Sequence, residues 1–150
     1  MESIEWLPRL TVATIVERDG RFLLVEEYAD GEELVYNQPA GHLDEYETLA
    51  AAAIRETLEE TAWEIRVDAI VGIYYWTHPK GHTFVRTCFA GTALHHHANQ
   101  PLDHGIQQAV WLTREEIAAS GPKLRSPMVL RCIDDYLAGK RYPLELFDYL

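Results

Sequence analysis

The sequence contains few cysteines and no apolar run long enough to cross a membrane. Cys88 and Cys132 lie far apart along the chain and lack the spacing of a metal-binding pair. We therefore expect two free, buried thiols in a reducing cytosol. The apolar stretches are shorter than the roughly 18–20 residues that a transmembrane helix needs. The N-terminus does not resemble a signal peptide. These absences predict a cytoplasmic protein without a membrane span.

Positive charge is also scarce, with 13 Lys and Arg against 24 Asp and Glu and a formal net charge of -11. Such a chain repels a nucleic acid backbone and an anionic lipid surface, which argues against both as partners. It would equally repel a free polyphosphate, so a substrate of that kind would need a bound cation between it and the protein. The sequence contains neither a P-loop nor a recognisable Ser-His-Asp constellation.

The chain shows no repeat, linker or low-complexity tract, so residues 1–150 are expected to form one domain. Two β-branched apolar runs, Leu10–Val16 and Phe22–Val25, flank Asp19-Gly20, which is a strong hairpin signal. A further short strand is predicted at Leu34–Gln38, before Pro39.

A helix and two long strands are predicted next. Thr48 is a suitable N-cap, and the Ala- and Glu-rich segment from Thr48 to Ala62 contains neither Gly nor Pro. The segments Ile65–Trp76 and Thr83–Leu94 have the composition of strands, with a turn between them at residues 78–81.

The last third of the chain predicts a short strand and two helices. Val110–Leu112 is the strand, and the capping box Thr113–Glu116 opens the first helix. Ser126-Pro127 opens the second helix, which should run to about Leu137 and end at Gly139. Strands and helices thus interleave, and several strands are joined by hairpins. The pattern indicates an α/β fold with a mixed sheet and helices packed on its faces.

Three carboxylates share one side of the helix that follows Thr48. With residues about 100° apart along a helix, Glu56, Glu59 and Glu60 fall within one arc. The opposite side carries the apolar residues that we expect to pack against the sheet: Ala51, Ile54 and Leu58. Carboxylates at these spacings repel one another unless a cation lies between them, and oxygen ligands favour Mg²⁺, Mn²⁺ or Ca²⁺. Taken alone, the same pattern also suits a solvated acidic face.

The residues around these carboxylates resemble the Nudix box. From Gly41 to Trp63 the segment has the box's spacing: Gly, five residues, Glu, seven residues, Arg-Glu, then Glu-Glu after two more residues. The matching positions are Gly41, Glu47, Arg55, Glu56, Glu59 and Glu60. The segment departs where Thr57 and Trp63 replace aliphatic residues and where Ala62 replaces a glycine. Ala62 puts the geometry of the following loop in doubt, because glycine there permits a positive φ.

The resemblance implies a Nudix fold, an α/β/α sandwich, and Mg²⁺-dependent hydrolysis, with Mn²⁺ as a possible substitute. It implies that Arg55 and Glu47 orient the site and that Glu59 is a metal ligand or the general base, with Asp103 as the alternative base. The implied metal ligands are Glu56, Glu59, Glu60 and the Gly41 carbonyl.

Segments outside the box resemble the NudJ-type branch of the family: residues 35–42, 124–127 and 139–145. This likeness implies a phosphatase that releases phosphate from thiamine-type pyrophosphates and nucleoside di- and triphosphates. A monomer is expected only as the default for a single chain. Two alternatives remain open. One is a pyrophosphohydrolase of nucleoside diphosphate derivatives such as ADP-sugars, and the other is a Nudix-fold sensor that binds a metabolite without cleaving it.

Two further residues are candidates for substrate binding. Arg86 lies in a largely apolar strand and either faces a phosphate or points to solvent. Trp76 either stacks on a flat substrate ring or packs against the protein. The run His95–His97 is expected in an exposed loop, because three consecutive side chains at a strand end cannot all point one way. Asp103 also fits a simple turn after Pro101.

Overall fold

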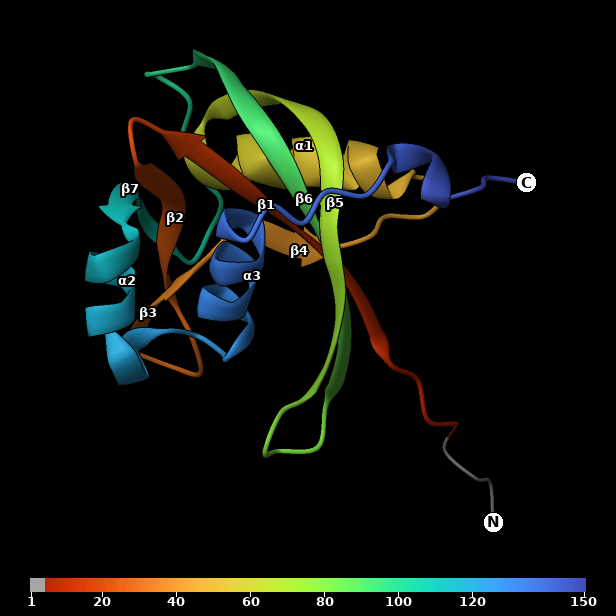
Figure 1. The fold of residues 1–150 in the computed structure, drawn as a ribbon. Coiled ribbons are helices and arrows are strands. Elements are labelled where there is room, and N and C mark those ends of the chain that lie inside the picture. The colour runs from red at the N-terminus through yellow and green to blue at the C-terminus, as the bar shows by residue number, and fades with distance from the viewer. Residues whose placement is uncertain (1–4) are drawn as a thin grey trace.

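The computed structural model describes residues 5–150, which fold around one mixed seven-stranded sheet (Figure 1). The strand order is β3-β2-β1-β6-β5, with β4 paired to β1 and β7 paired to β2. Only the β1–β6 pair is parallel among these pairings. The strands are β1 (Arg9–Arg18), β2 (Arg21–Tyr28), β3 (Leu34–Asn37), β4 (Ala40–His42), β5 (Trp63–Thr77), β6 (Thr83–His96) and β7 (Ile106–Thr113).

The helices are α1 (Leu49–Thr61), α2 (Arg114–Ala119) and α3 (Met128–Leu137), with short 3-10 turns at Gly121–Lys123 and Leu144–Leu146. The expected α/β fold with a mixed sheet is confirmed. That residues 1–150 form a single domain stays a prediction. Among the described residues, no helix is both long enough and apolar enough to span a membrane.

Alternation along β1 separates the two layers of helices. Val12 packs with α1, whereas Ala13 and Ile15 pack with α3. Successive side chains of a strand point to opposite faces of its sheet. The helices α1 and α3 therefore cover opposite faces of β1, which places β1 at the centre of the molecule.

The β1–β2 hairpin forms as the Asp19-Gly20 signal predicts. Both residues have positive φ, 51° and 77°, and Arg18 pairs with Arg21 across the turn. Two left-handed residues give the turn the twist that matches antiparallel strands. The short segment Ala40–His42 pairs with β1 as strand β4. Strand β7 extends well beyond Val110–Leu112, because it pairs with β2 along its length.

The expected packing face of α1 is only partly correct, because Ile54 packs against a core cluster but Ala51 does not. Ala51 is exposed, and Ile54 and Leu58 are only partly buried. The buried residues of the helix are Leu49, Ala52, Ala53, Thr57, Glu60 and Thr61. Thr57 is fully buried. Its hydroxyl donates a hydrogen bond to the Ala53 carbonyl at 2.8 Å, so burial leaves no unsatisfied polar atom on this side chain.

The ends of the predicted helices agree with the structure within about one residue. The Ser126 hydroxyl accepts a hydrogen bond from the Met128 N–H at 3.1 Å, and α3 begins at Met128. This helix ends at Leu137, before Gly139 with φ of 85°. Helix α1 ends in a left-handed residue, as the Nudix pattern implies, although that residue is Ala62 with φ of 61°.

Replacing Ala62 with glycine should stabilise the protein. The left-handed conformation costs an alanine roughly 1 kcal/mol relative to glycine, and Ala62 keeps its N–H bonded to the Leu58 carbonyl whichever residue is present. We expect Ala62→Gly to raise the free energy of unfolding by about 1 kcal/mol in urea titrations. The matched change Ala53→Gly, at a helical position, should lower it by about the same amount or more. A destabilised Ala62→Gly variant would contradict this account.

Candidate active site

The site begins where β4 meets α1. Pairing of Gly41 with Val12 of β1 brings the β4 backbone beside the helix. A Cβ atom at position 41 would coincide with the carboxylate of Glu56. A side chain at position 41 would therefore displace the Glu56 carboxylate, which lies directly against the Gly41 backbone.

Arg55 connects the acidic side chains on this side of the helix. Its Nε and Nη2 donate to the two carboxylate oxygens of Glu47 at 2.7 and 2.9 Å. Its Nη1 donates to Glu56 at 2.9 Å and to Glu59 at 3.2 Å. The hydrogen bond from Arg55 also holds the pKa of Glu47 below its usual value. One guanidinium thus holds three carboxylates by hydrogen bonds, with Glu47 held bidentately, and it also forms an ion pair with the exposed Asp44 at 3.2 Å.

A further carboxylate, that of Asp103, comes from a loop distant in the sequence. Oxygen atoms of Glu56, Glu59 and Asp103 all lie within 4.8 Å of one another. This spacing, with only oxygen donors, fits a hard divalent cation. The Asp103 N–H donates to the Glu59 carbonyl at 3.0 Å, and the Gln100 side chain donates to the Leu58 carbonyl at 2.7 Å. The loop is therefore docked on the last turns of α1. Nothing in the sequence marked Gln100 as the residue that helps to dock it.

Glu60 lies apart from this cluster. Its side chain is largely buried and accepts a hydrogen bond from the Ala40 N–H at 2.8 Å. Burial raises the pKa of Glu60 to about 9, and the charges of Glu27, Glu56 and Asp103 add to the effect. The three helix carboxylates therefore divide between two environments, although their spacing placed them within one arc.

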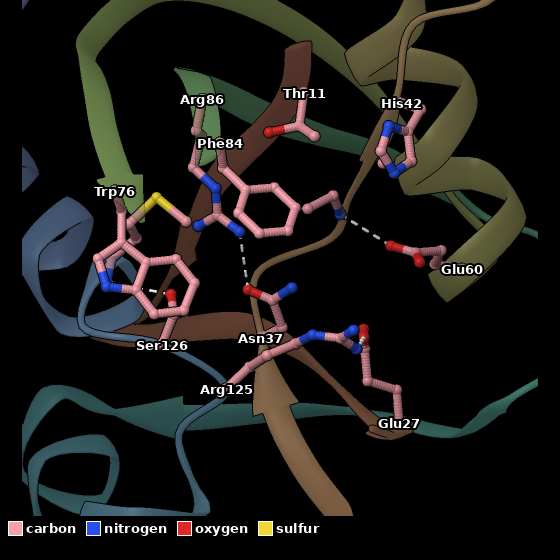
Figure 2. A pocket seen from close by; sticks show the side chains of 13 residues that line it. Thr11, Glu27, Asn37, His42, Glu60, Trp76, Phe84, Arg86, Arg125 and Ser126 are labelled. Atoms are coloured by element: carbon pink, nitrogen blue, oxygen red, sulfur yellow. Dashed lines mark hydrogen bonds and ion pairs between the residues drawn. The ribbon is translucent and has the colours of Figure 1, made fainter. Parts of the chain in front are cut away.

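A cavity of about 200 Å³ adjoins the acidic cluster (Figure 2). Gly41 and Glu60 line one end, and Trp76 and Phe84 line another part of its wall. The two aromatic rings stack with centroids 5.9 Å apart and planes 21° apart. Both substrate candidates, Trp76 and Arg86, thus line the same cavity as the box residues Gly41 and Glu60.

Arg86 is 4% exposed, which excludes the alternative that it points to solvent. Its Nη1 donates to Gln38 at 2.9 Å and its Nη2 donates to Asn37 at 3.0 Å, the latter drawn in Figure 2. Among the described residues no carboxylate forms an ion pair with Arg86, and its Nε has no hydrogen-bond partner. A buried cation held only by neutral amides would be stabilised by an anionic ligand in the cavity.

The histidine run and the two cysteines lie outside this cavity. His95 and His96 are exposed at the end of β6, and His97 pairs with Glu64 at 3.3 Å. None of these histidines lines the cavity. Cys88 and Cys132 are free and buried in the core, as expected.

Comparison with known proteins agrees with this geometry. The NUDIX domain matches residues 7–132, which is most of the chain. The chain belongs to the Nudix family. Phosphatase NudJ from Escherichia coli strain K12 is 41% identical over 139 residues, covering 93% of this chain and 90% of the relative. A solved NUDIX hydrolase from Nitrosomonas europaea superposes with a TM-score of 0.94 at 42% identity, covering 96% of this chain and 98% of that chain.

The protein is therefore a Nudix hydrolase, an enzyme of a family that acts on small phosphorylated substrates with divalent metal ions. The departures from the Nudix box are accommodated locally. Trp63 packs against His96, with ring centroids 4.8 Å apart, and meets Trp111 edge-on at 5.7 Å. The Thr57 hydroxyl donates a hydrogen bond to the Ala53 carbonyl. Ala62 adopts the left-handed conformation that is usual for glycine.

Glu60 should make the metal-free enzyme less stable as the pH rises. Its pKa is about 9 in the folded protein against an ordinary 4.5. Between these values the unfolded chain ionises Glu60 while the folded protein keeps it protonated, so folding becomes less favourable with increasing pH. Glu60→Gln removes this dependence. In EDTA, its stability relative to the wild type should increase by at least about 1 kcal/mol between pH 5 and pH 8. A difference that does not change with pH in urea titrations would contradict the assignment.

Proposed function

We propose that this Nudix hydrolase cleaves a phosphoanhydride bond in small organic di- or triphosphates with Mg²⁺, and that it releases inorganic phosphate. The observation that carries the proposal is the meeting of two features at one cavity. Gly41, which lines the cavity, lies directly against the carboxylate of Glu56, and oxygens of Glu56, Glu59 and Asp103 lie within 4.8 Å of one another. The buried cation Arg86 lines the wall of the same cavity.

The proposed metal ligands are Glu56, Glu59, Glu60 and the Gly41 carbonyl, with Mn²⁺ as a possible substitute for Mg²⁺. When bound, the cation supplies neutralisation of phosphate charge and activation of the attacking water. It also provides the positive charge that a chain of net charge -11 needs in order to bind a polyphosphate. Arg55 and Glu47 hold the carboxylates in place through the hydrogen bonds described above.

For the general base, the structure favours Asp103 over Glu59. Glu59 accepts a hydrogen bond from Arg55 at 3.2 Å, which occupies one of its carboxylate oxygens. Asp103 has no ion pair among the described residues. Its carboxylate lies within 4.8 Å of the two helix carboxylates, close enough to accept a proton from a water held there.

The proposed substrate class follows from Arg86 and Trp76, which line the same cavity as Gly41 and Glu60. Arg86 would bind an anionic group of the substrate, and Trp76 would stack on its flat ring. Thiamine-type pyrophosphates and nucleoside di- and triphosphates offer both features. The similarity to a relative named Phosphatase NudJ supports phosphate release over the alternative cleavage of ADP-sugars into two phosphorylated halves. A non-catalytic sensor is the third possibility. We further propose a monomer in the cytoplasm.

Released phosphate distinguishes these functions. We expect phosphate from thiamine pyrophosphate and from nucleoside di- and triphosphates, in the presence of Mg²⁺ and not of EDTA. ADP-ribose, as a representative ADP-sugar, should release little. Glu56→Gln should reduce kcat/KM by at least about 100-fold, as expected for loss of a charge that holds the cation. The exposed change Glu115→Gln serves as a matched control. Bound substrate that stays intact for hours in Mg²⁺ would instead support the sensor.

The general base can be identified from the response to Mg²⁺. We expect Asp103→Asn to lower kcat by about 100-fold or more, with little change in the Mg²⁺ concentration that gives half-maximal activity. Glu59→Gln should raise that concentration, because it removes a metal ligand. The opposite result, in which Asp103→Asn weakens Mg²⁺ activation and Glu59→Gln does not, would assign the two roles the other way round.

A further inference from the structure

A second cavity, also of about 200 Å³, lies beside the tip of the β5–β6 hairpin. Trp76, Phe84 and Arg125 line both this cavity and the first one. Gly41 and Glu60, at the metal end, line only the first. The second cavity therefore continues the first one past the aromatic pair, in the direction away from the acidic cluster.

The charge of this second cavity is opposite to that of the whole chain. Its lining contains three permanent cations, Arg9, Lys80 and Arg125, and one acid, Asp30. Two histidines, His78 and His82, complete its polar wall. In a chain with only 13 Lys and Arg and a net charge of -11, this is a local excess of positive charge. Cations gathered in one hollow repel one another, and a bound anion relieves that repulsion.

Most of these side chains keep donors available for a ligand. Arg9 donates one hydrogen bond to the His82 ring at 3.2 Å, and within residues 5–150 its other donors have no partner. Its guanidinium lies 5.7 Å from the Phe84 ring. Lys80 pairs with Asp30 at 3.1 Å, but both side chains are largely exposed, 66% and 76%. Such an exposed pair contributes little stability and exchanges partners readily. Only Arg125 has a largely buried counter-ion, Glu27 at 2.8 Å.

The aromatic pair between the cavities fixes the geometry of a ligand that would occupy both. A flat ring stacked on Trp76 would have the scissile phosphates on the side of Gly41 and Glu60. A substituent on the opposite side of that ring would lie among Arg9, Lys80 and His82. Guanidinium and ammonium groups bind carboxylates and phosphates through charge-assisted hydrogen bonds.

We propose that this second cavity is a subsite for an anionic group on the far side of the substrate's ring. The preferred substrates are then organic diphosphates that carry a second anionic group, a carboxylate or a phosphate, beyond the ring. This inference rests on the proposed function, since it assumes that the diphosphate lies at the acidic cluster.

Two matched probes test the subsite. N6-carboxymethyl-ADP and N6-carbamoylmethyl-ADP have nearly the same shape and differ by one negative charge beyond the adenine ring. With Mg²⁺, we expect kcat/KM for the carboxylate to exceed that for the carboxamide by about tenfold, which corresponds to about 1.4 kcal/mol. The ratio should fall towards one in Arg9→Gln and Lys80→Gln. It should persist in Arg66→Gln, which removes a surface charge on β5 outside both cavities.

Calorimetric binding of the same probes to the Glu59→Gln variant separates this inference from the proposed function. A preference for the carboxylate in binding, without hydrolysis by the wild type, would support the subsite and contradict the catalytic proposal. Equal affinities and equal kcat/KM for the two probes would overturn the subsite and leave the catalytic proposal intact. Binding of ADP with rejection of both probes would also overturn it, because the ring would then not face the second cavity. If the ratio of kcat/KM for the two probes fell as much in Arg66→Gln as in Arg9→Gln and Lys80→Gln, the preference would be a general effect of surface charge, and the subsite would be overturned.

Discussion

The arrangement of the active site depends on one guanidinium. Arg55 contacts Glu47, Glu56 and Glu59 within 3.2 Å, so carboxylates that would repel one another are held around a single positive charge. At an effective dielectric constant of 20, two like charges about 4 Å apart repel by roughly 4 kcal/mol. A network of this kind lets the helix keep its acidic side before a cation binds. It engages only one oxygen each of Glu56 and Glu59, which leaves the other oxygen of each available for that cation.

The sheet determines which groups meet at the cavity. Strand β1 lies at its centre and separates α1 from α3. Its pairing with β4 brings Gly41 against Glu56, and its parallel pairing with β6 places Arg86 opposite Thr11. The acidic residues and the buried cation therefore come from separate elements that share β1 as a neighbour. This common neighbour explains why the acidic cluster lies beside the cavity wall that carries Arg86.

The acidic cluster and the cavities beside it differ in the charged residues that they carry. Acidic residues gather where a divalent cation would lie, and four of the 13 Lys and Arg residues line the cavities beyond it. Arg86 and Arg125 line the first cavity, and Arg9 and Lys80 line the second. A polyphosphate repelled by the chain as a whole would thus find favourable charge along the path from the acidic cluster to the hairpin tip.

Local signals in the sequence determined the hairpin at Asp19-Gly20, the capped helices and, through the spacing from Gly41 to Glu60, the membership of the Nudix family. These features depend on residues close in the chain, whose preferred backbone angles and hydrogen bonds are largely independent of the rest of the protein. Tertiary structure alone decided that Glu60 is buried against Ala40, that Arg86 is enclosed, and that Asp103 joins Glu56 and Glu59. Helical spacing fixes which residues share a side of a helix, but it does not specify which strand or loop covers that side. Those contacts join segments tens of residues apart, and only the packed sheet brings them together.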